Sequence, residues 1–187
     1  AALKVAFDSS LQAGDWQVLR PIADQMLDVA EGLDDRGRID ALVYDSLILD
    51  VLGDFGAGAS RINEALRIAR SAVIPDLMIE AGVHHASSLE RLGHLAEAGS
   101  AAKEAMELSN RAGDFPKLRS RPEGLVHRLA VARGPWREAV TGLETFARSL
   151  DDPHYRLAYR QMAASARSKI EGKRATPRIV ELVEAGL

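Results

Sequence analysis

Apolar and polar residues recur along the chain at intervals of three and four positions. In the segment 61–70, the apolar side chains share one face of a helix and the charged side chains share the opposite face. Strand-forming residues are scarce, since the chain has three Tyr and no segment alternates cleanly between apolar and polar residues. Ala, Leu, Arg and Glu dominate, and these residues lose least on entering a helix. The pattern predicts an all-α fold.

Glycines that follow an apolar helix end recur at a nearly constant spacing. These glycines are Gly14, Gly53, Gly93, Gly134 and Gly172. The spacings between successive glycines are 39, 40, 41 and 38 residues. A large apolar residue stands two positions after each of the first four glycines. A glycine tolerates the left-handed conformation that ends one helix and lets the next helix fold back beside it. We therefore predict helix–turn–helix units with a turn at each glycine.

The same register continues into the helix that follows each turn. Five, nine and twelve positions after the first four glycines stand mostly small or apolar residues: Leu19, Gly58, Ala98 and Ala139; Ala23, Ile62, Ala102 and Leu143; and Met26, Ala65, Ala105 and Phe146. Small residues at such positions let two helices approach closely. Helices packed in pairs are therefore expected to meet at these positions.

The register also sets approximate helix boundaries. First helices of the pairs are predicted near 1–12, 38–52, 76–92, 123–133 and 153–171, and second helices near 16–31, 55–71, 95–111, 136–149 and 177–185. Pro75 and Pro153 suit the first turn of a helix. Pro21 predicts a kink in its helix or a delayed start. Pro116 and Pro122 predict a long, irregular loop before the helix at 123–133.

This pattern resembles the tetratricopeptide repeat (TPR) family, in the Gly-Asp-Trp and Gly-Asp-Phe turns at 14–16 and 53–55 and the small residues that follow. The resemblance covers essentially the whole chain. The repeat of 38–41 residues is longer than the ~34 typical of the family, and is similar to the sensor arms of LuxR/MalT-type and AfsR-type bacterial transcription regulators. The resemblance implies a right-handed superhelix (an α-solenoid) of about five antiparallel helix pairs, as one repeat domain over 1–187. The chain opens in helical register without methionine, which favours a fragment of a larger protein.

The resemblance also implies a partner-binding groove on the first helices, which line the concave face of such a solenoid. Family positions thirteen, ten, six and three residues before each turn glycine give the candidate residues Asp40, Val43, Leu47, Asp50, Glu80, Val83, Ser87, Glu90, Arg121, Arg128, Tyr159, Met162 and Lys169. The groove is acidic in its first half and basic in its second. It suits a protein segment with opposite charges and apolar anchors, although solvated helix faces also carry such charges. The implied function is a non-catalytic scaffold that binds a protein or peptide, or other domains of its own parent chain, as the regulatory arm of a signalling or transcription protein.

Two other functions stay open. A sensor domain would bind a small molecule or a signalling peptide, and a closed, partly apolar pocket near Tyr155, Tyr159 and Met162 would favour it. Homo-oligomer formation would use exposed apolar residues of the predicted last helix, which are Ile179, Val180, Leu182 and Val183. Docking of that helix onto residues 155–170 is the more expected use of this apolar stripe.

Composition and missing motifs exclude several classes of protein. A net charge of −3 and a pI near 6.0 argue against direct binding of nucleic acid. No apolar stretch approaches the ~20 residues that span a bilayer, and the absence of cysteine excludes thiol chemistry and fits the cytoplasm. There is no phosphate-binding GxxxxGK motif and no GxSxG nucleophile motif. His84 and His85 are adjacent and diverge by about 100° on a helix, so they do not face one metal ion and we expect no metal site. Because the phosphate-binding and nucleophile motifs are missing, we also expect no cofactor and no catalysis.

Overall fold

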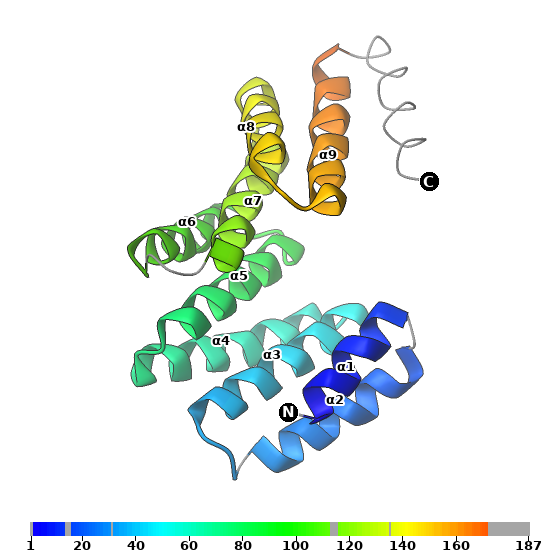
Figure 1. Ribbon diagram of the computed structural model, residues 1–187, viewed down its shortest axis with the longest axis vertical. Coiled ribbons are helices and arrows are strands. Elements are labelled where there is room, and N and C mark those ends of the chain that lie inside the picture. Colours follow the sequence, from blue (N-terminus) through cyan, green and yellow to red (C-terminus); the bar gives the residue numbers. More distant parts are fainter. Residues whose placement is uncertain (1, 14–15, 31, 113–115, 135, 172–187) are drawn as a thin grey trace. The chain divides into compact units, whose positions relative to one another are not determined.

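The computed structural model describes residues 2–13, 16–30, 32–112, 116–134 and 136–171, and within these ranges the chain consists of helices and short turns. In chain order (Figure 1), the helices are α1 (Ala2–Ala13), α2 (Trp16–Ala30), α3 (Asp35–Val51), α4 (Phe55–Ala72), α5 (Pro75–Arg91), α6 (Leu95–Ala112), α7 (Pro116–Arg133), α8 (Trp136–Ser149) and α9 (Pro153–Glu171). The predicted all-α fold is confirmed.

The chain divides into two compact units, with α1–α5 in unit 1 (residues 1–94) and α6–α9 in unit 2 (residues 95–187). Within each unit, every helix packs against the next one along the chain. In addition, α3 contacts α5 in unit 1, and α7 contacts α9 in unit 2. Within each unit, consecutive helices therefore pack side by side, and α3 and α5, like α7 and α9, are neighbouring first helices. The single domain and the handedness of the superhelix stay predictions.

Glycine makes the turns that the sequence predicted. Gly53, Gly93 and Gly134 have φ angles of 84°, 81° and 68°, a region in which residues with a Cβ atom are strained. After two of these glycines, the backbone N–H of the next residue reaches back over the helix end: Asp54 to the carbonyl of Leu49, and His94 to that of Leu89, both at 2.9 Å. These bonds satisfy carbonyl groups that a helix end leaves unpaired. Gly14 and Gly172 lie outside the described residues.

The residues of the predicted register are buried within their units. Every residue predicted five, nine and twelve positions after the first four glycines is buried. At Gly58 the approach is closest, because a Cβ atom there would lie 2.7 Å from Oδ1 of Asp50 and 3.2 Å from the backbone carbonyl oxygen of Ser46. Glycine therefore lets α4 pack directly against α3.

Most predicted helix boundaries agree with the structure to within three residues, and one prediction was wrong. No irregular loop occupies residues 116–122, because α7 begins at Pro116. A proline at the first helical position lacks only an N–H that would be unpaired anyway, and Pro122 is buried inside the same helix. Likewise α2 begins at Trp16, so Pro21 lies inside the helix and does not delay its start. The predicted helix at 177–185 lies outside the described residues.

Replacing Ala65 or Ala105 with leucine tests the register, because these side chains are 0% and 1% exposed. We expect each change to lower the free energy of unfolding by about 1–3 kcal/mol, since three extra carbon atoms overpack the helix contact. Exposed Ala96 on α6 provides the matched control, and Ala96→Leu should change stability by less than about 0.5 kcal/mol. Urea unfolding followed by circular dichroism measures all three, and equal stability of the three variants would show that the register is wrong.

Candidate functional site

Helices α3 and α5 carry the residues predicted for the first half of the groove. Six of these residues are half-buried: Asp40, Leu47, Glu80, Val83, Ser87 and Glu90. Val43 and Asp50 are buried, with 6% and 9% of their surface exposed. Val43 packs in a core cluster with Ile39 and Ile62. Its side chain packs in the core of unit 1, so it stabilises α3, and its place in the predicted groove stays a prediction.

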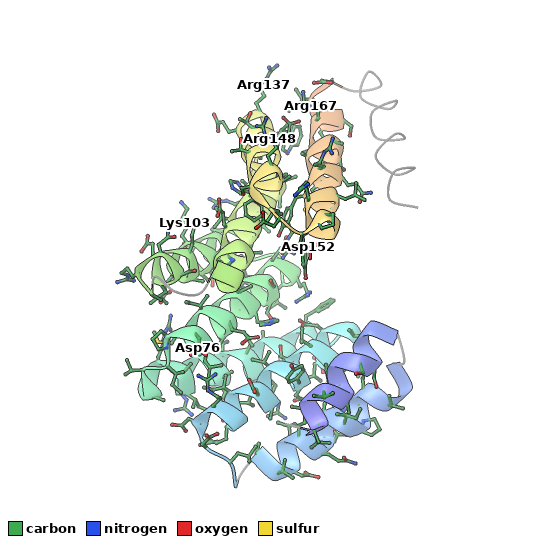
Figure 2. The ribbon with its side chains drawn as sticks, viewed as in Figure 1. Asp76, Lys103, Arg137, Arg148, Asp152 and Arg167 are labelled. Carbon is green, nitrogen blue, oxygen red and sulfur yellow. The ribbon has the colours of Figure 1, made fainter. Side chains whose placement is uncertain are left out.

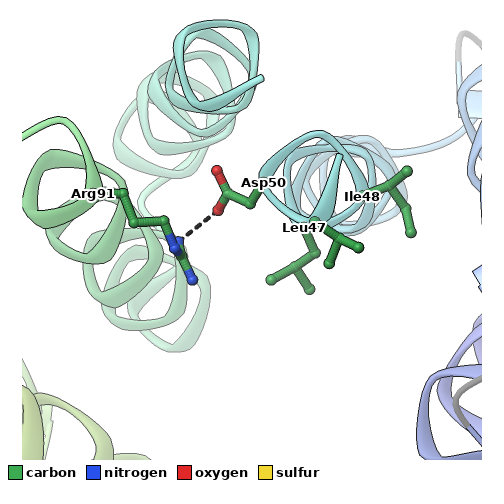
Figure 3. Close-up of a pocket in the computed structure, with 5 residues that line it drawn as sticks. Leu47, Ile48, Asp50 and Arg91 are labelled. Atoms are coloured by element: carbon green, nitrogen blue, oxygen red, sulfur yellow. Dashed lines mark hydrogen bonds and ion pairs between the residues drawn. The ribbon is translucent and has the colours of Figure 1, made fainter. Parts of the chain in front are cut away.

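Two of the predicted residues, Leu47 and Asp50, lie together at a pocket of about 150 Å³. Ile48 and Val51 complete its α3 side, and Arg91 at the end of α5 forms the other side (Figure 3). Val51 is 51% exposed, whereas Ile48 is 3% exposed. The pocket therefore has an apolar floor, one exposed apolar edge and one charged side. The pocket is open to solvent on one side, and its volume is similar to that of an apolar cavity that can hold benzene.

An ion pair forms the charged side of this pocket. Arg91 Nη1 donates to Oδ2 of Asp50 at 2.5 Å. Burial raises the pKa of Asp50, and the charge and hydrogen bond of Arg91 oppose that rise. A second pair joins the opposite ends of the same helices, with Arg36 Nη1 2.8 Å from Oδ2 of Asp76. Opposite charges therefore hold α3 and α5 together at both ends.

A buried carboxylate that the sequence analysis did not single out lies on the same helix. The Asp45 side chain is 1% exposed and accepts a hydrogen bond from Arg61 Nε of α4 at 2.8 Å. Arg20 Nη1 of α2 lies 3.4 Å from its other oxygen. Asp45 therefore connects three helices of unit 1. Both arginines are partly exposed while the carboxylate is enclosed, which indicates a structural role.

The residues predicted for the second half of the groove belong to unit 2. Arg128, Tyr159 and Met162 are half-buried. Lys169 is exposed, and its Nζ atom lies 5.7 Å from the ring centroid of Trp136, a distance at which a cation is attracted to the ring face. The side chain of Arg121 lies outside the described residues. The structure therefore gives contacts for only part of this half of the predicted groove.

Tyr159 belongs to an aromatic cluster with His127 and Phe146 on α7, α8 and α9. The rings of Phe146 and Tyr159 meet edge to face with centroids 4.9 Å apart, and His127 lies 5.6 Å from Phe146. A Cβ atom at Gly124 would overlap the Tyr159 hydroxyl, so glycine makes room for this ring. Burial lowers the pKa of His127 and raises the pKa of Tyr159, which keeps both uncharged at neutral pH. The cluster holds α7, α8 and α9 of unit 2 together, and the ring of Tyr159 is part of these packing contacts.

Charge is divided unequally between the two units. Residues 1–94 contain 8 Lys and Arg against 15 Asp and Glu, a net charge of −7. Residues 95–187 contain 16 Lys and Arg against 12 Asp and Glu, a net charge of +4. The near-neutral total of the whole chain therefore conceals an acidic unit 1 and a basic unit 2.

No group of three or more His, Asp or Glu side chains in the described ranges of the chain is placed to hold a metal ion. No helix within the same ranges combines the length and apolar character needed to cross a bilayer.

Solved structures with TPR-like repeats are similar to this chain, whereas no known family profile and no curated protein matches its sequence. A putative kinesin light chain with nearly identical TPR-like repeats from Podosopora anserina has a TM-score of 0.70 and 16% identity, over 98% of this chain and 92% of that chain. A variant of that protein has a TM-score of 0.72 and 17% sequence identity to this chain. BtubC (BKLC) from P. vanneervenii has a TM-score of 0.71 and 14% sequence identity, over 98% of this chain and 79% of that chain. These similarities confirm the predicted TPR-like fold.

Proposed function

We propose that this chain is a non-catalytic protein-interaction scaffold that holds a segment of a partner protein against α3 and α5. The observation that carries the proposal is the pocket at Leu47, Asp50 and Arg91, where apolar side chains lie beside a charged pair on neighbouring first helices. The TPR-like fold supports it, because stacked helical hairpins present extended surfaces to their partners. An apolar anchor residue of the partner would fill the pocket.

The charge of unit 1 supports a basic partner segment. Asp40, Glu80 and Glu90 are half-buried on the two first helices, and unit 1 has an acidic excess as a whole. Lys or Arg residues beside the anchor residue would be attracted to these carboxylates, which favours both encounter and correct register. We therefore propose a segment that combines one aliphatic or aromatic residue with flanking cations.

A narrower role is proposed on the sequence resemblance. The repeat of about 40 residues and the Gly-Asp-Trp and Gly-Asp-Phe turns support a regulatory arm of a bacterial signalling or transcription regulator in the cytoplasm. The partner segment then belongs to another protein or to another domain of the same parent chain. The alternative is a sensor of a small molecule or a signalling peptide, and self-association is a third possibility.

Affinity capture from the source lysate tests the proposed function. Asp50 is a poor position for a charge reversal, because a lysine there would face Arg91. Val51 is exposed and lines the pocket, and Val29 on α2 is equally exposed, at 50% against 51%. We expect Val51→Asp and Glu90→Lys to release a protein that the wild type and Val29→Asp retain.

The captured protein then allows a quantitative measurement. Isothermal titration calorimetry with its purified binding segment should show affinity weakened at least about tenfold by Val51→Asp, equivalent to about 1.4 kcal/mol. Val29→Asp should leave affinity unchanged. Equal binding by both variants would place the interaction on another surface of the chain.

A further inference from the structure

A second pocket, of about 160 Å³, lies in unit 2 between α6 and α7. Leu129 and Ala130 of α7 contribute to its apolar wall, and Leu129 is 1% exposed. Lys103 of α6 and Arg133 of α7 also line it, and both of these side chains are exposed. The pocket therefore combines an apolar floor with two cations at its rim, whereas the pocket of unit 1 has a balanced ion pair.

The absence of a side chain at Gly99 places the two cations close together. A Cβ atom at Gly99 would lie 2.7 Å from Arg133 Nη1, so the guanidinium group rests over the bare backbone of α6. Lys103 follows Gly99 by four positions, and residues at this spacing are neighbours on a helix face, with Cβ atoms about 5–6 Å apart. Arg133 and Lys103 therefore lie about one helical turn apart along the same face.

Neither cation has a carboxylate partner within the described part of the chain. No hydrogen bond or ion pair there involves the side chain of Lys103 or Arg133, whereas Arg36, Arg91 and Arg167 each contact a carboxylate. Two like charges at this separation repel each other. An anion between them would remove that repulsion and accept charge-assisted hydrogen bonds from both.

Taken singly, each cation has an ordinary structural explanation. Arg133 lies in the last turn of α7, where a positive charge interacts favourably with the helix dipole, and Lys103 is an exposed lysine on the solvated face of α6. Neither explanation accounts for their closeness to each other beside an apolar floor. That combination matches a ligand that has both an apolar group and an anion.

We propose that this pocket binds a segment of a partner protein in which an aliphatic residue stands next to a carboxylate residue, as in Leu-Glu. The aliphatic side chain fills the space over Leu129 and Ala130, and the carboxylate pairs with Lys103 and Arg133. The site is separate from the groove on α3 and α5, and it selects the opposite charge. A negative result at this pocket therefore leaves the proposed function on α3 and α5 untouched, and a negative result there leaves this proposal untouched.

Nuclear magnetic resonance titration of the ¹⁵N-labelled chain with the peptide acetyl-Ser-Leu-Glu-Ser-amide tests this site, because the method detects affinities as weak as about 1 mM, near −4 kcal/mol. We expect saturable shifts at the backbone amides of Gly99, Ala130 and Gly134. The Gln analogue, which lacks the carboxylate, and the analogue with Ala in place of Leu should each bind at least about fivefold more weakly. Inorganic phosphate serves as an anion without an apolar group.

Variants locate the binding energy. Lys103→Gln and Arg133→Gln should each weaken binding of the Leu-Glu peptide at least about fivefold, and unchanged circular dichroism shows that the fold is intact. Arg137→Gln is the matched control, since Arg137 is an exposed cation on α8 that does not line the pocket (Figure 2). It should leave binding unchanged.

Four outcomes overturn the proposal. They are the absence of saturable shifts, equal binding of the Gln analogue, phosphate binding as tight as that of the peptide, and equal weakening by Arg137→Gln. Sedimentation velocity adds a fifth. A self-association that Lys103→Gln abolishes would assign the pocket to a second copy of this chain and not to the proposed segment.

Discussion

Replacing Phe146 with alanine is expected to lower the free energy of unfolding by about 3–5 kcal/mol, the largest effect among the substitutions considered. Phe146 is 3% exposed, and its ring meets Tyr159 and His127 from two other helices. Alanine removes both ring contacts and leaves a cavity between α7, α8 and α9. Gly124 cannot fill that cavity, because it has no side chain.

Urea unfolding in a Trp16→Phe background, where the fluorescence comes from Trp136 alone, measures this loss within unit 2. The control Phe146→Leu keeps most of the buried volume but loses the ring contacts, so it should cost roughly 1–2 kcal/mol. A loss below about 1 kcal/mol for Phe146→Ala would show that α7, α8 and α9 do not meet at this ring.

Replacing Arg91 with glutamine is expected to cost about 2–3 kcal/mol at neutral pH, because it leaves the carboxylate of Asp50 buried without a counter-ion. The Asp50 side chain is 6% exposed, whereas that of Arg91 is 40% exposed and stays solvated when its partner is removed. The reverse change, Asp50→Asn, should therefore cost less than about 1 kcal/mol. This asymmetry separates a buried carboxylate from an ordinary surface ion pair, in which both changes are small.

The pH dependence of the Arg91→Gln variant provides a second test. Burial already raises the pKa of Asp50 in the folded chain, and loss of Arg91 raises it further. A group whose pKa is higher in the folded state than in the unfolded state destabilises the fold when it is ionised. The stability deficit of Arg91→Gln should therefore shrink as pH falls from neutral through the pKa of Asp50, whereas a constant deficit down to about pH 4 would contradict this explanation.

Helix pairing could be predicted from the sequence because it depends on local features that repeat. Gly53, Gly93 and Gly134 end helices in the left-handed conformation, and the sequence contains each of them at the same distance from the next apolar residue. The small residues five positions later are buried for the same reason in each repeat. Such signals need no knowledge of which helices are neighbours.

The proline-containing segment before the fourth turn shows where local rules failed. Pro116 and Pro122 are both unfavourable in the interior of a helix. The structure places Pro116 at the first position of α7 and buries Pro122 within it. Packing of α7 against its neighbours then outweighs the lost backbone hydrogen bond, and this tertiary contribution is absent from a local pattern.

The composition of the candidate site was only partly predictable. Leu47 and Asp50 were identified by position, whereas Arg91 was missed because groove positions were transferred from the family one helix at a time. A signal was present, since Arg91 follows Asp50 by 41 residues and Asp76 follows Arg36 by 40, which is one repeat. Opposite charges at the repeat spacing indicate pairs between neighbouring first helices. Burial of Val43 and Asp45 depends on three helices surrounding α3, which the sequence pattern does not reveal.

Photo-crosslinking from position 51 tests the proposed binding surface most directly. A benzophenone amino acid at Val51, on the exposed edge of the unit 1 pocket, is irradiated in the source lysate, and the same amino acid at Val29 is the control of equal exposure. We predict a discrete covalent adduct with one protein at position 51, whose crosslinked peptide contains an apolar residue flanked by Lys or Arg, and no such adduct at position 29. Identical adducts from both positions, or none from position 51, would contradict the assignment of the binding surface to α3 and α5.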